Sequence, residues 1–142
     1  MARAQVYCAI DRGDLAAADA LARAVAPAVD GLKLGLEFFA ANGPDGIRQI
    51  RRLGRPLFLD LKLCDIPNTV AGAVRSVAPL APRFVTLHAT GGKAMLRAAV
   101  DAGRDAGPAT RFLAVTVLTS LDAADLHGLG VHRSPSDQVR NL

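Results

Sequence analysis

The chain has 142 residues, of which 51% are hydrophobic, so it is long enough and apolar enough to bury the core of one domain. Its net charge of +4 suits a phosphorylated substrate, but it has no Lys/Arg-rich run with interleaved aromatic residues, so we do not expect nucleic-acid binding. No apolar run approaches the ~18 residues of a membrane span, and Cys8 and Cys64 lack metal-site spacing. We therefore expect a cytoplasmic protein that does not act at a membrane.

Apolar segments alternate with segments of helical periodicity along most of the chain. Strands are predicted at residues 6–10, 29–35, 57–63, 84–88 and 112–118. Helices are predicted at residues 14–26, around residues 47–53 after the Gly43-Pro44 break, at 67–77, and from the Gly91-Gly92 pair onward. Beyond Leu121 the pattern weakens: a short helix at 122–126 is plausible, and the polar tail shows no clear periodicity.

This alternation predicts an α/β fold with a parallel sheet, because each parallel strand needs a crossover connection before the next. The chain contains no composition shift that would mark a linker or a second domain. We therefore expect a single domain of repeated strand-helix units.

The most informative segment is the predicted strand at residues 57–63 and the loop after it. Leucines occupy one face of this strand, while Asp60 and Lys62 lie on the other face, about 7 Å apart along the strand. In parallel α/β proteins the carboxyl ends of the strands carry the chemistry. An ordinary ion pair at a strand end is the alternative, although burying such a pair is costly. Asp65 taken alone is typical of a helix-capping or turn residue.

Polar side chains lie at or near the carboxyl end of each of the five predicted strands, which would place them together at one end of the sheet. The positions are Asp11, Lys33, Asp60, Lys62, Asp65, His88, Thr119 and Ser120. His88 is better explained by a structural hydrogen bond to the backbone. Two of the three lysines lie here in a chain that otherwise uses arginine, and an ammonium group can transfer a proton where a guanidinium group effectively cannot.

The run Asp60-x-Lys62-x-x-Asp65-Ile66-Pro67-Asn68-Thr69 resembles the active-site signature of the orotidine 5'-phosphate decarboxylase family. The resemblance extends to residues 6–11, 31–35, 87–92 and 114–120, and so covers roughly the first 120 residues in collinear order. Cys64 departs from the pattern, since the family commonly has His there. We expect Cys64 to pack as a small hydrophobic side chain, with a modest effect on the chemistry.

The resemblance implies a (β/α)8 TIM barrel, which needs about 250 residues. We therefore expect residues 1–142 to form a single incomplete barrel domain, truncated to roughly five β/α units. The C-terminal strands and the loops that bind the substrate phosphate would lie outside it.

The resemblance also implies a role for each site residue in decarboxylating orotidine 5'-phosphate to uridine 5'-phosphate, a step of de novo pyrimidine biosynthesis. Lys62 would protonate C6 of the pyrimidine, and Asp60 would lie beside the substrate carboxylate and orient Lys62. Asp65 would act in the neighbouring subunit's site, so the family implies a homodimer with shared sites and no metal or organic cofactor. The substrate-binding residues would be Asp11 and Lys33 at the ribose, Thr69 across the dimer, and Thr119 or Ser120 at the pyrimidine.

Two other functions stay open. Sugar-phosphate decarboxylases and synthases of the same superfamily share the Asp-x-Lys-x-x-Asp pattern and use Mg²⁺, although the Ile-Pro-Asn-Thr continuation favours the pyrimidine enzyme. The chain could also be a non-catalytic barrel fragment that keeps the signature without the function.

Overall fold

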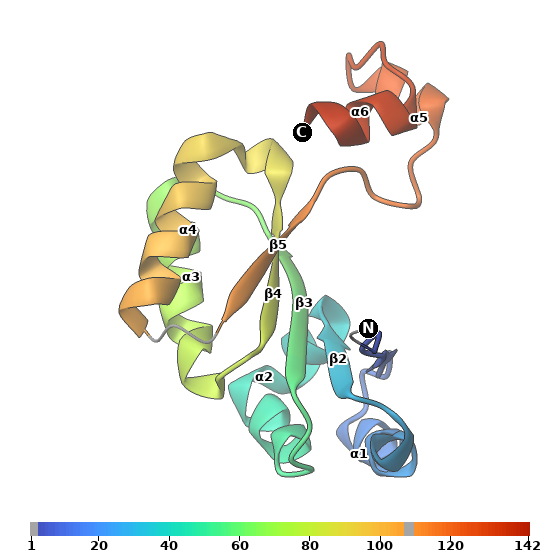
Figure 1. Ribbon diagram of the computed structural model, residues 1–142, viewed down its shortest axis with the longest axis vertical. Helices are drawn as coiled ribbons and strands as arrows, with labels where there is room; N and C mark the ends of the chain where they lie inside the picture. The colour runs from blue at the N-terminus through green and yellow to red at the C-terminus, as the bar shows by residue number, and fades with distance from the viewer. Residues whose placement is uncertain (1–2, 107–109) are drawn as a thin grey trace.

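The computed structural model describes residues 3–106 and 110–142 and contains one parallel β-sheet (Figure 1). Its strands lie in sequence order, each hydrogen-bonded in parallel to the next. They are β1 (Tyr7–Ala9), β2 (Gly31–Gly35), β3 (Leu57–Leu63), β4 (Phe84–His88) and β5 (Arg111–Val115). The predicted parallel α/β architecture is therefore confirmed.

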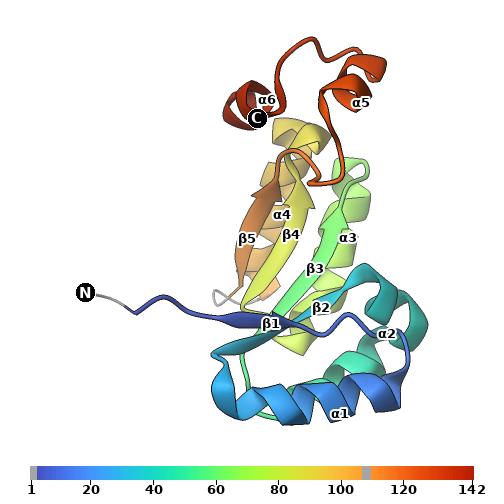
Figure 2. The same cartoon turned by 90° about the vertical axis from the view of Figure 1, so that its right-hand side faces the viewer.

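Four helices connect these strands and pack on one face of the sheet, as right-handed crossovers in sequence order require (Figures 1 and 2). They are α1 (Leu15–Val25), α2 (Leu36–Arg51), α3 (Pro67–Val77) and α4 (Gly92–Ala106), with single 3₁₀ turns at Ala26–Ala28, Ala78–Leu80 and Ala89–Gly91. Within the described part of the chain, no helix combines the length and apolarity that crossing a membrane requires.

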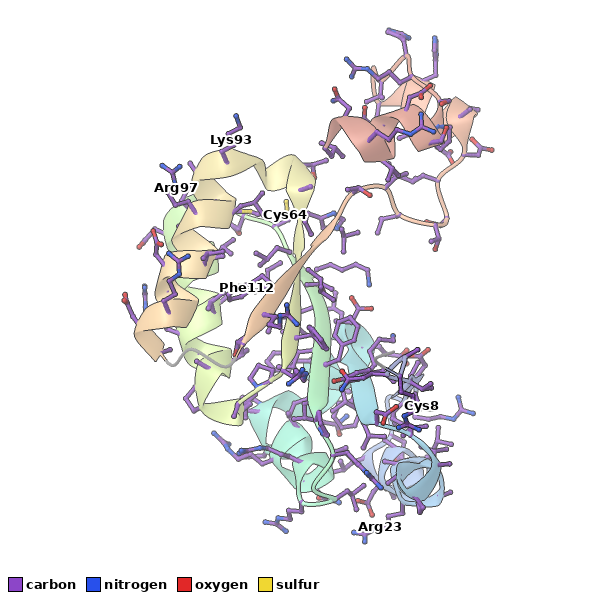
Figure 3. All side chains as sticks on the ribbon, viewed as in Figure 1. Cys8, Arg23, Cys64, Lys93, Arg97 and Phe112 are labelled. Atoms are coloured by element: carbon purple, nitrogen blue, oxygen red, sulfur yellow. The ribbon has the colours of Figure 1, made fainter. Side chains whose placement is uncertain are left out.

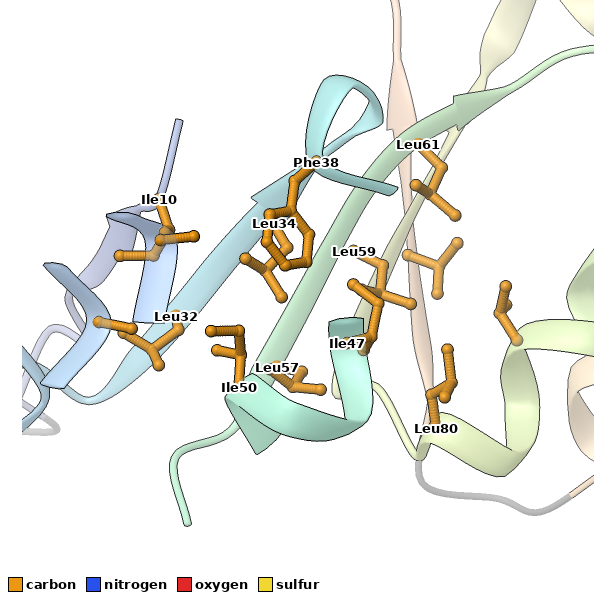
Figure 4. Packing of buried hydrophobic residues seen from close by; sticks show 14 residues of the cluster. Ile10, Leu32, Leu34, Phe38, Ile47, Ile50, Leu57, Leu59, Leu61 and Leu80 are labelled. Carbon is orange, nitrogen blue, oxygen red and sulfur yellow. The ribbon is translucent and has the colours of Figure 1, made fainter. Parts of the chain in front are cut away.

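The core lies between the sheet and these helices (Figure 4). Leu57, Leu59 and Leu61 of β3 point into it and are at most 5% exposed, and Ile47 and Ile50 of α2 pack against them at 0% exposure. Burying each such side chain contributes about 1.5–3 kcal/mol. Since side chains alternate along a strand, this leucine face fixes Phe58 and Asp60 on the opposite, concave face of the sheet.

The amino-terminal half of the concave face carries an aromatic cluster. The ring of Tyr7 meets those of Phe58 and Phe84 edge-on, with centroids 6.1 and 5.5 Å away. A Cβ atom on Gly31 would lie 2.1 Å from Cε1 of Tyr7, so only glycine allows β2 to approach this ring. The aromatic rings fill the amino-terminal half of this face, and polar side chains such as Asp60 lie in its carboxyl-terminal half.

Two predicted boundaries are wrong by three residues or more, whereas the others lie within two residues of the observed ones. Helix α2 begins at Leu36 rather than after Gly43-Pro44: the chain kinks at Gly43, whose φ is 58°, and Pro44 then starts a second helical stretch, where its lack of an N–H costs nothing. Strand β5 ends at Val115 rather than at residue 118. Val115 pairs with His88, the last residue of β4, so β5 has no neighbour to pair with beyond it.

The C-terminal segment contains two short helices beyond the carboxyl end of β5, α5 (Ala123–Gly128) and α6 (Pro135–Asn141) (Figure 2). The first confirms the predicted short helix, and Asp122 and Asp125 form a capping box at its start. The second was not predicted. The sequence does carry a local sign of this helix start. Ser134 is the N-cap and accepts a hydrogen bond from the Asp137 amide, and Pro135 occupies the first turn.

Candidate active site

Strand β3 changes conformation just where its polar side chains begin. Its pairing with β4 is regular to Leu59 opposite Val85, then shifts so that Leu63 lies opposite Leu87. Within this bulge Lys62 adopts φ 49°, the left-handed region that non-glycine residues rarely occupy. Holding a lysine there costs about 1–3 kcal/mol, and such strain clusters at functional sites.

Four charged side chains from three adjacent strand ends lie close together beside this bulge. Nζ of Lys62 donates to Oδ1 of Asp60 at 2.8 Å, and Nζ of Lys33 lies 3.5 Å from Oδ2 of the same carboxylate. Nζ of Lys33 is also 3.7 Å from Oδ1 of Asp11. The result is a row of alternating charge, Asp11–Lys33–Asp60–Lys62, which we call the charge cluster.

The charge cluster is partly shielded from solvent. The side chains of Asp60 and Lys33 are 16% and 25% exposed, whereas those of Lys62 and Asp11 are 37% and 68% exposed. Burial alone would raise the pKa of Asp60, but hydrogen bonds from Lys62 and Thr86 and the charges of Lys62 and Lys33 lower it by more, so this pKa lies below its ordinary value. Asp60 is therefore held as a carboxylate between two ammonium groups.

Thr86 of β4 is a site residue that the sequence reasoning missed. Its side chain is 4% exposed, and its hydroxyl donates to Oδ1 of Asp60 at 2.9 Å while accepting from the Lys62 amide at 2.9 Å. The available signal was a polar residue at a concave-face position of an apolar strand, directly beside the strand that carries Asp60.

The charge cluster borders a hollow of about 280 Å³ at the carboxyl ends of β1–β3. Asp11, Lys33, Asp60 and Lys62 all line it, so the structure brings these four predicted residues together. Arg12 and Glu37, which the sequence reasoning did not single out, line it too. A substrate in this hollow would meet both cations and both carboxylates.

The other predicted site residues lie outside this hollow. Asp65 and Thr69 are exposed on the loop after β3 and the first turn of α3, and Thr119 and Ser120 are exposed on the turn after β5. Cys64 is also exposed, so the prediction that it packs as a small hydrophobic side chain is wrong. The strained Lys62 conformation interrupts the alternation of the strand, and position 64 no longer faces the core.

A larger hollow of about 500 Å³ lies at the opposite end of the sheet and is lined by Arg48, Arg51, Arg52 and Arg55. The first three sit in the last turn and cap of α2, where cations complement the partial negative charge of a helix C-terminus. We assign no chemistry to this hollow. Among residues 3–106 and 110–142, no three His, Cys, Asp or Glu side chains are grouped as metal ligands would be.

These features define a class of protein: a parallel β/α-barrel fold with a charged site at the carboxyl ends of its strands. Residues 4–142 match the family model described as "Orotidine 5'-phosphate decarboxylase / HUMPS family". The chain belongs to this family.

Curated relatives with the name orotidine 5'-phosphate decarboxylase agree with this assignment. The relative from Sphingopyxis alaskensis is 55% identical over 137 residues, covering 96% of this chain and 60% of its own length. The relative from Anaeromyxobacter dehalogenans is 56% identical over 138 residues, covering 97% of this chain and again 60% of its own length. The chain thus spans about 60% of the length of these relatives.

Solved structures show the same relation in three dimensions. An orotidine 5'-phosphate decarboxylase from Lactobacillus acidophilus superposes with a TM-score of 0.82 at 32% identity, covering 96% of this chain and 64% of that one. An uncharacterised conserved protein from Geobacillus kaustophilus superposes with a TM-score of 0.86 at 35% identity, covering 95% and 65%. The five strand-helix units therefore correspond to part of a larger barrel.

Proposed function

We propose that this chain carries the decarboxylating centre of an orotidine 5'-phosphate decarboxylase, which forms uridine 5'-phosphate in de novo pyrimidine biosynthesis in the cytoplasm. The observation that carries the proposal is the charge cluster, in which Asp60 lies 2.8 Å from one ammonium group and 3.5 Å from another. Family membership and the names of the relatives support it.

The cluster suits a reaction that builds negative charge on carbon. The bond between C6 and the carboxylate breaks, its electron pair stays on C6, and carbon dioxide leaves. Lys62 then gives its proton to C6 and regains one from water. Asp60 lies against the substrate carboxylate, where repulsion disfavours the ground state and is relieved as carbon dioxide departs. Electrostatic stabilisation by preorganised charges in a shielded site is usually the largest single contribution to the catalysis of such a step.

The remaining roles follow the resemblance and the positions of the residues. Lys33 and Asp11 line the hollow beside Asp60 and would hold the ribose hydroxyl groups. Thr119 and Ser120 would contact the pyrimidine from the turn after β5. Both residues are exposed and lie outside the hollow.

We further propose that Asp65 and Thr69 complete the site of a second subunit in a homodimer. Both are exposed on the β3–α3 connection, and Ile66 between them is 66% exposed. Both residues are therefore accessible to a neighbouring subunit, as the family resemblance implies. The Asp65 carboxylate would then extend its partner's charge cluster.

In TIM barrels the phosphate-binding site is frequently formed by the loops after strands 7 and 8. The sheet of the described residues has five strands, so such loops are not among them. We propose that residues 1–142 form part of one barrel domain and that the 142-residue polypeptide alone turns over poorly. Without residues that bind the phosphate, this polypeptide lacks binding energy from a part of the substrate distant from C6, and that energy contributes to catalysis.

The experiment uses the 142 residues joined to the part of the Sphingopyxis alaskensis relative that they do not cover, which we call the completed protein. We expect it to convert orotidine 5'-phosphate to uridine 5'-phosphate, and the Lys62→Ala variant to lose this activity while still binding uridine 5'-phosphate. A completed protein that folds but does not decarboxylate would contradict the proposal.

The family description also names HUMPS. A Mg²⁺-dependent sugar-phosphate decarboxylase or synthase is therefore the alternative function. Treatment with a metal chelator separates the two. We expect decarboxylation of orotidine 5'-phosphate to survive chelation. Activity on a sugar phosphate that chelation abolishes would favour the alternative.

A further inference from the structure

Thr86 makes two hydrogen bonds, and both go to the catalytic segment of β3. Its hydroxyl donates to Oδ1 of Asp60 at 2.9 Å and accepts from the Lys62 amide at 2.9 Å. A hydroxyl group has one proton to donate and lone pairs to accept, so one side chain can serve both partners at once. At 4% exposure, no solvent competes effectively for these bonds.

The second bond falls where the backbone of β3 leaves its regular path. Between Leu59 and Leu63 the register with β4 shifts, and Lys62 within that interval has φ 49°. A strained conformation persists only when its surroundings over-determine it. The Thr86 hydroxyl supplies such a constraint, because it holds the amide of the strained residue itself.

The first bond acts on the carboxylate at the centre of the charge cluster. Asp60 faces Lys62 on its own strand, Lys33 on β2 and Thr86 on β4, and Asp11 after β1 lies beyond Lys33. Oδ1 accepts from Lys62 and from Thr86, whereas Oδ2 has Lys33 at 3.5 Å. Thr86 is therefore the uncharged group that fixes the rotation of this carboxylate.

We propose that Thr86 is a positioning residue, whose hydroxyl locks the Asp60 carboxylate and the Lys62 backbone into the arrangement that lets Lys62 deliver its proton. This inference rests on the proposed function for the direction of proton transfer. The hydrogen-bonding role itself does not, and can be measured in the ligand-free chain.

Three variants isolate the hydroxyl group. Thr86→Val keeps the shape of the side chain and removes the hydroxyl, whereas Thr86→Ser keeps the hydroxyl. Thr110→Val is the matched control, because the Thr110 hydroxyl is also partly buried but donates to the Pro82 carbonyl, away from the charge cluster. The 142-residue chain is labelled with ¹³C at the aspartate carboxyl carbons, and the Asp60 resonance, assigned with Asp60→Asn, is followed as the pH is lowered.

We expect Thr86→Val to raise the pKa of Asp60, because one of the hydrogen bonds that favours the carboxylate is lost. Thr86→Ser should restore the unmodified titration, and Thr110→Val should not change it. An Asp60 titration that is the same in Thr86→Val and in the unmodified chain would overturn the proposal. So would an equal shift in Thr110→Val, which would reduce Thr86 to a general packing role.

Amide exchange of Lys62 gives a second measurement if Thr86→Val does not fold. In the unmodified chain and in Thr86→Ser we expect the Lys62 amide to be protected from exchange, because it donates to the hydroxyl. Exchange of this amide as fast as that of an exposed loop amide in the folded, unmodified chain would refute the proposed contact.

Kinetics in the completed protein then test the consequence. We expect Thr86→Val to lower kcat about ten- to a hundredfold, the usual effect of losing a hydrogen bond to a charged group, with little change in KM. Thr86→Ser should recover most of kcat. A loss confined to KM would contradict the positioning role. No turnover in the unmodified completed protein would count against the proposed function, while the Asp60 titration would still decide the role of Thr86.

Discussion

Replacing Asp60 by asparagine should destabilise the folded chain in a way that depends on pH. Asparagine has nearly the same shape and keeps one oxygen acceptor, but it removes the charge that faces Lys62 at 2.8 Å and Lys33 at 3.5 Å. A hydrogen bond to a charged group contributes about 1.5–3 kcal/mol. Because Lys62 is 37% exposed and water can partly replace its partner, we expect a loss of about 1–2 kcal/mol at pH 7.

The sign of the pH dependence follows from the lowered pKa of Asp60. Between the two pKa values the unfolded chain binds more protons than the folded chain, so the carboxylate stabilises the fold fully above its ordinary pKa of 3.8. That stabilisation is lost as the pH falls through the lower value of the folded chain. The difference between the unmodified chain and Asp60→Asn should therefore be constant from pH 7 to about pH 5 and shrink below pH 4.

Urea unfolding followed by circular dichroism at pH 7, 5 and 3 measures this difference. Asp45→Asn is the control, since the Asp45 side chain is 94% exposed and pairs with Arg48 within one helix. We expect the control to change stability little at any pH. A difference for Asp60→Asn that stayed constant or grew as the pH fell would refute the account of how Asp60 is held.

Three further predictions concern residues at the end of β3 and in the loop after it. Lys62→Gly should be more stable than Lys62→Ala by about 1 kcal/mol in urea unfolding, since glycine accepts φ 49° without strain and alanine does not; equal stabilities would argue against that backbone conformation. In the completed protein, Lys62→Ala and Asp65→Ala subunits that are inactive alone should regain activity when mixed, because a hybrid dimer contains one intact shared site, and no recovery despite subunit exchange would contradict that dimer. Cys64→His should change kcat/KM by only a modest factor, as expected of an exposed side chain outside the hollow, and a change of several orders of magnitude would show that position 64 takes part in the chemistry.

The central part of the fold was predictable because its local signals agree with its tertiary environment. Strand β3, helix α3 and strand β4 were predicted with their observed bounds. Leucines at every second position mark one buried strand face, and Pro67 marks the first turn of the following helix. For these three elements, the local sequence preferences and the tertiary packing favour the same secondary structure.

The errors arose where tertiary contacts overrode local patterns. Gly43-Pro44 predicts a helix start, yet residues before it are helical because Phe38 packs into the core at 1% exposure. β5 stops at Val115 because its neighbour ends there, which no pattern within residues 112–118 reveals.

The candidate site was predictable in its charges and not in its geometry. Strand alternation placed Asp60 and Lys62 on one face, and the spacing of strand ends brought Lys33 and Asp11 near them. The left-handed backbone of Lys62 and the supporting hydroxyl of Thr86 depend on a register shift between two strands. A register shift is a property of the pair of strands, so neither sequence segment shows it alone.

The most direct test of the central claim compares three forms of the completed protein in the decarboxylation of orotidine 5'-phosphate. These are the unmodified form, Lys62→Ala, and Lys93→Ala as the matched control, because Lys93 is exposed in the first turn of α4 and does not line the hollow (Figure 3). General-acid and electrostatic catalysis each contribute about 10²-fold or more, so we predict that Lys62→Ala lowers kcat by at least about 10⁴-fold. Lys93→Ala should leave kcat unchanged. Turnover of Lys62→Ala within tenfold of the unmodified form would contradict the account.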